Sequence, residues 1–271
     1  MGSFITLTTD FGVTDGYVAA MKGVIYSLNP EVTIVDINHH IQPQNIREAA
    51  FVLSTVYSYF PIYTVHVVVV DPGVGTNRRP LILKTPRAHF VGPDNGVFSY
   101  ILEAYSCEPQ PESQRVRLGP EIKGYAITRS EYWHQPVSRT FHGRDIFAPV
   151  AARLSSGLLA SSLGDSIDTV TAFTIPHSVR QNNTITGQIL HIDHFGNLIT
   201  NIKEENLSSA GQSVTIVIKE YSIEGMAQTY SDTEGPAALF GSSGYLEISI
   251  SNGSAAAFFH SQIGDEIRVL L

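Results

Sequence analysis

The stretch at residues 67–81, VVVVDPGVGTNRRPL, ends an apolar run with a carboxylate and places an arginine seven residues further on. The apolar run predicts a buried strand, and the Pro-Gly-Val-Gly stretch after Asp71 predicts a tight turn. A carboxylate and a guanidinium brought together by this turn, Asp71 and Arg78, can hold and polarise a water molecule, although an ordinary turn would also explain the pattern. The glycines form neither a phosphate-binding loop nor a complete dinucleotide fingerprint.

Two further stretches place polar residues beside apolar elements. Asp10 follows the first predicted strand, and a carboxylate there can accept two hydrogen bonds from a ribose diol. Asp15 is predicted to be the N-cap of the next helix. His142 precedes another predicted helix, whose start Asp145 would cap or stabilise by its charge. A lone histidine is more often structural, so His142 alone is a weak signal.

A third stretch, HIDHFGNLITN, has Asp193, Asn197 and Asn201 around a Phe-Gly pair. A β-turn would explain the glycine and the asparagines. The same residues could also present a carboxylate and an amide to the charged groups of an amino acid. No spacing of His, Asp or Glu matches a recognised metal site, and there is no Gly-x-Ser-x-Gly nucleophile elbow.

The elements that must position these residues change in character along the chain. In the first half, apolar strands alternate with helical periodicity, and the strand at 64–70 lacks polar alternation, which predicts a parallel sheet buried on both faces. After about residue 176, short β-branched runs separated by Gly, Ser and Asn predict a small antiparallel sheet or barrel. We therefore predict an α/β fold: an N-terminal α/β domain with a central, mostly parallel sheet at residues 1–178, and a smaller C-terminal β-barrel-like domain at residues 179–271. Helices are predicted at 15–28, 45–60, 96–104 and 144–154.

The composition excludes several classes of protein. The 271 residues include 17 Lys and Arg against 25 Asp and Glu, and the net charge is −8, so nucleic acid is not an expected partner. The lone cysteine, Cys107, excludes an intramolecular disulfide and a cysteine-rich zinc site. No apolar run reaches the roughly 18 residues of a membrane span, and the first residues lack the basic and apolar regions typical of a secretory signal. We expect a cytoplasmic protein that does not bind membranes.

Seven stretches stand out in their order along the chain: TTDFG..D.YVAAMKGVIYSLNP, IVDI.H.I.P..I..AAFVL, FP..TVHVVVVDPGVGT.RRPL, FVGPDNGVFS, TFHGRDIFAPVAA, IDHFGNLITNI and GSSGYLEIS. Together they resemble the stretches of the S-adenosylmethionine (SAM) hydroxide adenosyltransferases, which are SAM hydrolases related to fluorinating and chlorinating enzymes. They reach from near the first residue almost to the last. The sequence departs from the expected pattern at Asn38 and His40, and the segment 103–125 does not align.

The resemblance implies a role for each candidate residue. The residues that match the catalytic set of the family are Asp71, Arg78 and His142. The residues that match its substrate-binding positions are Asp10 for the ribose, Asp193 and Asn197 at or beside the methionine part, and Tyr230 for an aromatic ring that stacks on adenine. Members of the family are homotrimers, in which each ligand lies between the N-terminal domain of one subunit and the C-terminal domain of its neighbour.

The implied reaction breaks the bond between sulfur and the ribose C5′ of SAM and yields adenosine and L-methionine. The sulfonium departs as a neutral thioether, so no general acid, metal or cofactor is expected, and SAM itself is the substrate. The protein must supply an oriented oxygen nucleophile in line with the C5′–S bond. Two alternatives remain. One is a SAM-dependent halogenase, although the halogenating members of this group lack the Asp-Arg-His set. The other is a non-catalytic module that binds SAM or adenosine, in which a buried carboxylate and guanidinium would be a cost without a reaction to perform.

Overall fold

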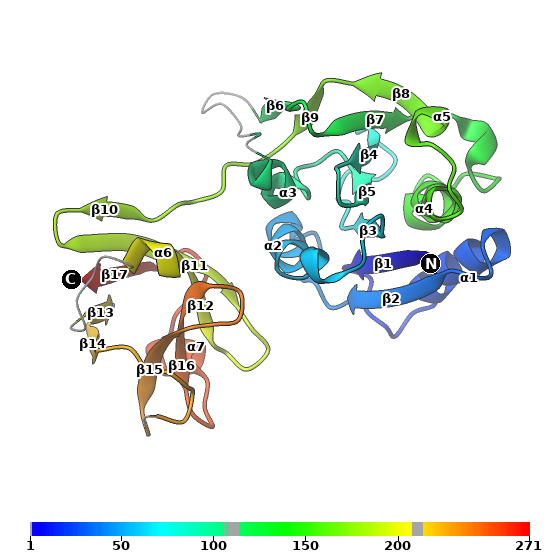
Figure 1. Ribbon diagram of the computed structural model, residues 1–271. Coiled ribbons are helices and arrows are strands. Elements are labelled where there is room, and N and C mark those ends of the chain that lie inside the picture. Colours follow the sequence, from blue (N-terminus) through cyan, green and yellow to red (C-terminus); the bar gives the residue numbers. More distant parts are fainter. Residues whose placement is uncertain (1, 106, 108–113, 208–213, 233) are drawn as a thin grey trace. The chain divides into compact units, whose positions relative to one another are not determined.

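The structure is a computed structural model that describes residues 2–105, 107, 114–207, 214–232 and 234–271. It divides into two compact units, Met1–Ile175 and Pro176–Leu271, each built on its own sheet (Figure 1). The first sheet contains a parallel core and the second is an almost closed antiparallel barrel. The predicted fold class is therefore confirmed.

In the first unit, the described strands form one large sheet whose central part is parallel. Its order is β2–β1–β3–β5–β4–β7–β8, and the pairs among the first four strands are parallel. The remaining strands extend the sheet in antiparallel fashion. The bounds are β1 (Phe4–Thr9), β2 (Thr33–Asn38), β3 (Val65–Val69), β4 (Pro80–Lys84), β5 (His89–Pro93), β7 (Lys123–Ile127) and β8 (Gly164–Ile167), with β6 (Arg115–Arg117) and β9 (Thr169–Thr171) as a separate pair.

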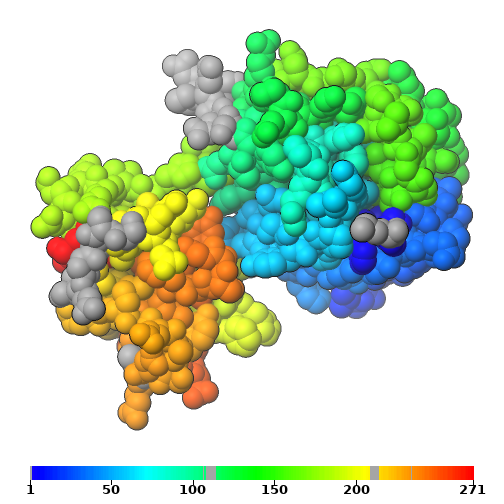
Figure 2. Space-filling view, in the orientation of Figure 1, coloured from blue at the N-terminus to red at the C-terminus, as the bar shows by residue number. Residues whose placement is uncertain are grey.

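Both faces of this sheet are covered, as the apolar β3 predicts. Because successive side chains of a strand point to opposite faces, Val67 and Val69 belong to one apolar core and Val68 and Val70 to another. Helices α1 and α4 cover the first face, and α2 and α3 cover the second (Figure 1). On the face seen in Figure 2, the side chains around α1, in blue, meet those around α4, in green. The central parallel strands are therefore fixed by an apolar core on each face of the sheet.

The helices follow the predicted periodicity, with differences at their ends. Their bounds are α1 (Tyr17–Leu28), α2 (Ile46–Val56), α3 (Ser99–Ala104), α4 (Ala148–Ser155) and α5 (Ala160–Leu163), with the 3₁₀ turns η1 (Tyr57–Tyr59) and η2 (Ser130–Tyr132) and the π-helical turn η3 (Gly143–Phe147). Asn45 caps α2, since its side chain accepts a hydrogen bond from the Glu48 N–H at 3.1 Å. The predicted cap of α1 is wrong: Gly16 occupies the N-cap position, no side chain caps the helix, and Asp15 is exposed.

In the second unit, the described strands follow the order β14–β13–β17–β11–β12–β16–β15, and β10 pairs with β11. The bounds are β10 (Val179–Gln181), β11 (Thr184–Ile192), β12 (Leu198–Lys203), β13 (Thr215–Ile218), β14 (Tyr221–Glu224), β15 (Pro236–Phe240), β16 (Tyr245–Ile250) and β17 (Glu266–Leu270), with the short helices α6 (Glu204–Leu207) and α7 (Ala255–Phe259). The pairs are antiparallel, and alternate residues such as Ile185, Ile189 and Ile267 fill the interior. The connections at the ends of these strands carry the candidate residues of this unit.

Among the residues that the structure describes, no helix combines the length and the apolar character that crossing a bilayer requires. The cytoplasmic location stays a prediction.

Candidate active site

The structure brings Asp71, Arg78 and His142 into direct contact. Nε of Arg78 donates to both carboxylate oxygens of Asp71 at 2.9 Å, and its Nη2 donates to Oδ2 as well. The same Nη2 lies 2.7 Å from Nδ1 of His142. The side chains of Asp71 and Arg78 are only 5% and 9% exposed. A pair this buried and this well matched is held more firmly than a surface ion pair.

The contact with Arg78 fixes the tautomer of His142. A guanidinium only donates hydrogen bonds, so Nδ1 of His142 is the acceptor, and in the neutral ring the proton is on Nε2. Burial, together with the positive charge of Arg78, lowers the pKa of His142 below its usual value of 6.5. His142 is therefore neutral at pH 7 and can donate a hydrogen bond from Nε2.

The predicted turn after Asp71 is present and depends on glycine. The backbone carbonyl of Asp71 accepts from the N–H of Val74 at 3.1 Å, and Gly75 has φ +77°. A Cβ atom at Gly75 would lie 2.4 Å from the backbone oxygen of Arg139. At the start of the turn, Asn95 Nδ2 donates to the carbonyl of Val70 at 2.9 Å. These contacts hold the strand end and the turn, and so bring Arg78 back onto Asp71.

His142 is positioned by a different element from the predicted one. A π-helical turn, η3, begins directly after it, and α4 follows; π-turns are frequent at functional sites. Asp145 does not cap a helix. Its fully buried carboxylate accepts from the Ser138 N–H at 2.7 Å and from Arg144 Nε at 2.6 Å, which ties the loop before His142 to the turn after it.

Asp71 and His142 line a pocket of about 280 Å³ together with Asp10. Oδ2 of Asp10 accepts from the backbone N–H of Gln44 at 2.8 Å, and Oδ1 has no partner among the described residues. The rings of Phe11 and Phe141 also line the pocket. The site thus combines a carboxylate with a free oxygen, an apolar wall and the buried Asp71–Arg78–His142 contact.

The other candidate residues lie in the second unit, around a pocket of about 650 Å³ that contains Asp193, Asn197 and Tyr230. Asp193 Oδ1 accepts from the backbone N–H groups of Phe195 and Asn197, and its Oδ2 accepts from Asn197 Nδ2, all at 2.9 Å. The backbone carbonyl of Asp193 accepts from the N–H of Gly196 at 3.0 Å, so the β-turn that the sequence offered as the alternative is present. The turn also places Asp193 and Asn197 at the pocket, and their binding to the charged groups of an amino acid stays a prediction.

Asn201 does not belong to this pocket. Its Oδ1 accepts from the Gln188 N–H at 2.8 Å, and its Nδ2 donates to the Pro176 carbonyl at 3.1 Å. Asn201 therefore links β12 to β11 and to the segment before β10. Sequence reasoning missed several lining residues of the pocket, among them Phe195, Ser251 and Asn252. Phe195 is 74% exposed beside this pocket, and its exposure is a property of the folded unit that the sequence does not reveal.

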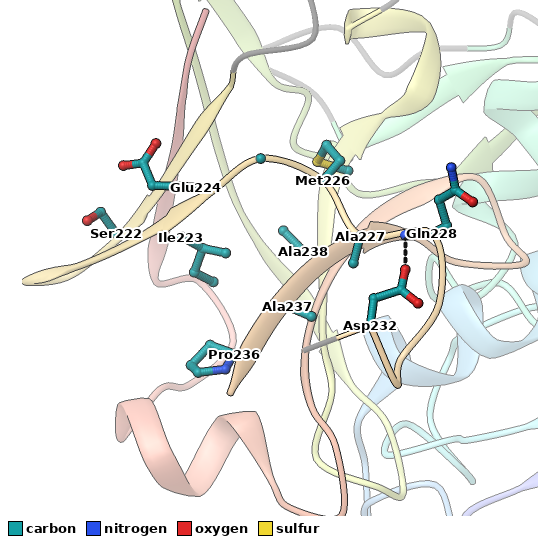
Figure 3. Close-up of a pocket in the computed structure, with 11 residues that line it drawn as sticks. Ser222, Ile223, Glu224, Met226, Ala227, Gln228, Asp232, Pro236, Ala237 and Ala238 are labelled. Carbon is teal, nitrogen blue, oxygen red and sulfur yellow. Dashed lines mark hydrogen bonds between the residues drawn. The ribbon is translucent and has the colours of Figure 1, made fainter. Parts of the chain in front are cut away.

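Within the described part of the chain, no group of three or more His, Cys, Asp or Glu side chains is arranged to hold a metal ion. A further pocket of about 590 Å³ lies between β14 and β15 and is lined mainly by small and apolar residues (Figure 3). Tyr230 lies in the loop that borders this further pocket between β14 and β15.

Comparison with known proteins agrees with this geometry. The family model of the SAM hydroxide adenosyltransferase N-terminal domain matches residues 5–164, and that of the C-terminal domain matches residues 187–268. The chain belongs to the SAM hydroxide adenosyltransferase family. The resemblance inferred from the sequence is therefore confirmed.

Relatives that align with almost the whole chain are named as hydrolases. The chain is 36% identical to the (R)-S-adenosyl-L-methionine hydrolase of Methanocaldococcus jannaschii, over 98% of this chain and 95% of the relative. It is 34% identical to the hydrolase of the same name from Salinispora arenicola, over 98% and 97%. A fluorinase from Actinoplanes sp. is 27% identical over 76% of this chain and 74% of its own. The comparisons favour hydrolysis over halogenation, as predicted.

The fold is also found in a crystal structure of an uncharacterized conserved protein from Thermotoga maritima. The two chains are 34% identical, the TM-score is 0.88, and the match covers 98% of this chain and 100% of the other.

Proposed function

We propose that this family member hydrolyses SAM to adenosine and L-methionine, with Asp71, Arg78 and His142 as the catalytic residues. The observation that carries the proposal is the contact of Arg78 with both partners, Asp71 through Nε and Nη2 and His142 through Nη2. This contact lies beside a pocket that Asp71 and His142 share with Asp10. An arrangement of this kind suits a water molecule held by charge and hydrogen bonds next to a bound ribose.

The bond that forms joins a water oxygen to C5′, and the bond that breaks is C5′–S, whose electron pair leaves with the thioether of methionine. Arg78 stays cationic and stabilises a hydroxide-like oxygen, and its Nη1 has no partner among the described residues. His142 orients the water through its Nε2 proton, and Asp71 accepts a proton or a hydrogen bond from the water. Because the leaving group is neutral, the reaction needs no Lewis acid, and EDTA should leave the rate unchanged.

Substrate binding is divided among the remaining candidate residues. We propose that Asp10 binds the ribose diol through its free Oδ1, that Asp193 and Asn197 bind at the methionine part, and that the Tyr230 ring stacks on adenine. The relatives' names specify the R configuration at sulfur, so we propose that the R epimer of SAM is a substrate of this chain as well.

Incubation of the purified protein with each epimer of SAM, followed by chromatography of adenosine and methionine, tests the proposed function. Equal amounts of the two products are expected. Formation of a 5′-halo-adenosine in chloride or fluoride would instead support halogenation. Bound but unconverted SAM would support the non-catalytic module.

We also propose that the chain forms a homotrimer in which Arg78 and Asp193 of one site come from different subunits. Light scattering after gel filtration should give three times the chain mass of 29.6 kDa. Arg78→Ala and Asp193→Ala should each have much lower activity than wild type, and co-expression of the two should restore part of the activity, because some sites in mixed trimers combine two intact halves. A monomeric mass, or no restored activity, would contradict the shared site.

A further inference from the structure

Tyr230 lies in a loop between β14 and β15 that is closed on itself by Asp232. Oδ2 of Asp232 accepts from the backbone N–H groups of Gln228 at 2.8 Å and Thr229 at 2.9 Å, and Oδ1 accepts from the Thr229 hydroxyl at 2.6 Å. Figure 3 shows the first of these bonds at the edge of the pocket between the two strands. The backbone that carries Tyr230, from Gln228 to Asp232, is therefore held by the Asp232 carboxylate.

The ring of Tyr230 is held separately, at its far end. Its hydroxyl donates a hydrogen bond to Oε2 of Glu247 at 2.8 Å. Tyr230 is 46% exposed, whereas Glu247, in β16, is only 6% exposed. An exposed aromatic ring thus ends on a buried carboxylate of the barrel wall. Desolvation of the Tyr230 hydroxyl, together with its bond to Glu247, raises the pKa of Tyr230 to about 12, so the hydroxyl stays a donor.

The carboxylate of Glu247 occupies a place that a neighbouring glycine leaves open. A Cβ atom at Gly241 would lie 1.7 Å from Oε1 and 2.2 Å from Cδ of Glu247. Gly241 does not have a positive φ, so the lack of a side chain, and not the backbone, explains the glycine. Gly241, Glu247 and Tyr230 therefore form a chain of contacts from the barrel wall to the pocket that also contains Asp193 and Asn197.

We propose that Glu247 is a positioning residue for substrate: it fixes the ring of Tyr230 in the orientation in which the ring stacks on the purine base. The inference rests on the proposed function, which assigns Tyr230 to adenine. A ring that is already immobilised loses less conformational freedom when the base binds, so the anchor increases affinity without contacting the substrate itself.

The test compares Tyr230→Phe, which keeps the ring and removes the hydroxyl, with Glu247→Ala and with the double variant. Each single change should raise KM for SAM about 5- to 10-fold and leave kcat within about twofold, because one anchoring hydrogen bond is lost. The double variant should be no worse than either single variant, because both changes remove the same bond. Glu247→Gln, which keeps an acceptor oxygen for the hydroxyl, should have a KM within about twofold of wild type.

Gly241→Ala should reproduce the effect of Glu247→Ala by displacing the carboxylate. Gly235→Ala is the matched control, since a Cβ there meets nothing within 4 Å and should leave KM unchanged. The dissociation constant of adenosine is measured for the same variants and should rise in parallel with KM.

The adenosine measurement separates this proposal from the proposed function. If wild type binds adenosine but does not hydrolyse SAM, the proposed function fails and the adenosine constants still test the anchor. If wild type hydrolyses SAM while Tyr230→Phe leaves both KM and adenosine affinity unchanged, or the two single effects add in the double variant, the positioning role alone is overturned. If wild type neither binds adenosine nor hydrolyses SAM, both proposals are overturned.

Discussion

Nη2 of Arg78 lies 2.7 Å from Nδ1 of His142 while the same guanidinium holds both carboxylate oxygens of Asp71. One cation thereby fixes the orientation of a carboxylate and the tautomer of an imidazole. Lysine cannot replace it, because an ammonium cannot make a bidentate contact with a carboxylate and reach a second partner in the same plane.

Substitution of Arg78 should therefore reduce the chemical step more than binding. Arg78→Lys and Arg78→Ala are each expected to lower kcat by about 10²-fold or more, while SAM still binds. Steady-state kinetics and calorimetric titration with SAM measure the two effects. The control is Arg79→Lys, at the neighbouring arginine, which contacts Asp94 at 2.6 Å outside the pocket. It should lower thermal stability without changing kcat per folded enzyme.

The activity should fall in acid with a midpoint below pH 6.5. Protonation of His142 would place a second positive charge against Arg78 and remove the acceptor at Nδ1. Since burial and Arg78 lower the pKa of His142, this loss occurs only below the usual histidine value. The profile of kcat/KM against pH measures it. In His142→Asn the amide oxygen can still accept from Arg78, but the imidazole that orients the water is lost, so we expect kcat to fall about 10²-fold. Because the variant has no imidazole at this position, its pH profile should have no acid limb from this residue. If the acid limb of the profile is unchanged in the variant, a group other than His142 causes it.

Asp10 should contribute to binding of the ribose. Asp10→Asn is expected to raise KM about 10-fold or more and to change kcat little, because a charge-assisted hydrogen bond contributes about 1.5–3 kcal/mol. Titration with adenosine and 2′,3′-dideoxyadenosine checks the assignment: wild type should prefer adenosine, and the variant should bind the two alike. Asp168→Asn, at an exposed carboxylate, is the control. A variant that keeps the preference for the diol would show that another residue binds the ribose.

The turn after Asp71 should tolerate no side chain at Gly75. Gly75→Ala combines a positive φ with a Cβ placed 2.4 Å from the Arg139 carbonyl oxygen, so we expect a loss of at least about 1 kcal/mol in the free energy of unfolding and a lower kcat. Chemical denaturation and kinetics measure the two. Gly23→Ala, in α1 with no neighbour within 4 Å, should instead stabilise the protein by about 0.5–1 kcal/mol. If Gly75→Ala matches wild type in both measurements, the turn does not set the position of Arg78.

The sequence predicts those parts of the fold and site that depend on local pattern. The strand before Asp71, the turn and the approach of Arg78 follow from one stretch of the sequence, residues 65–78, and the apolar β3 indicates a sheet covered on both faces. The proximity of His142 to Arg78 does not follow locally, because 64 residues separate them. Only the resemblance to the family indicates it before the structure does.

Other features are set by tertiary contacts that leave little trace in the sequence. Strands β8, β14 and β15 are short, and β15 begins with Pro236, so none shows a clear alternating pattern. The π-turn after His142 depends on Asp145, which bonds to the distant backbone of Ser138 rather than to its own helix start. The exposed Asp15 has a residue type typical of a cap, but the helix begins one residue too late for it.

The most direct test is a single-turnover reaction with SAM in ¹⁸O-labelled water, run with wild type and with Arg78→Lys. The account predicts that the label enters the 5′-hydroxyl of adenosine and not methionine, and that the variant binds SAM with wild-type affinity but reacts at least about 100-fold more slowly. Label in methionine, or a variant that reacts at the wild-type rate, would contradict attack on C5′ by a water molecule that Arg78 holds with Asp71 and His142.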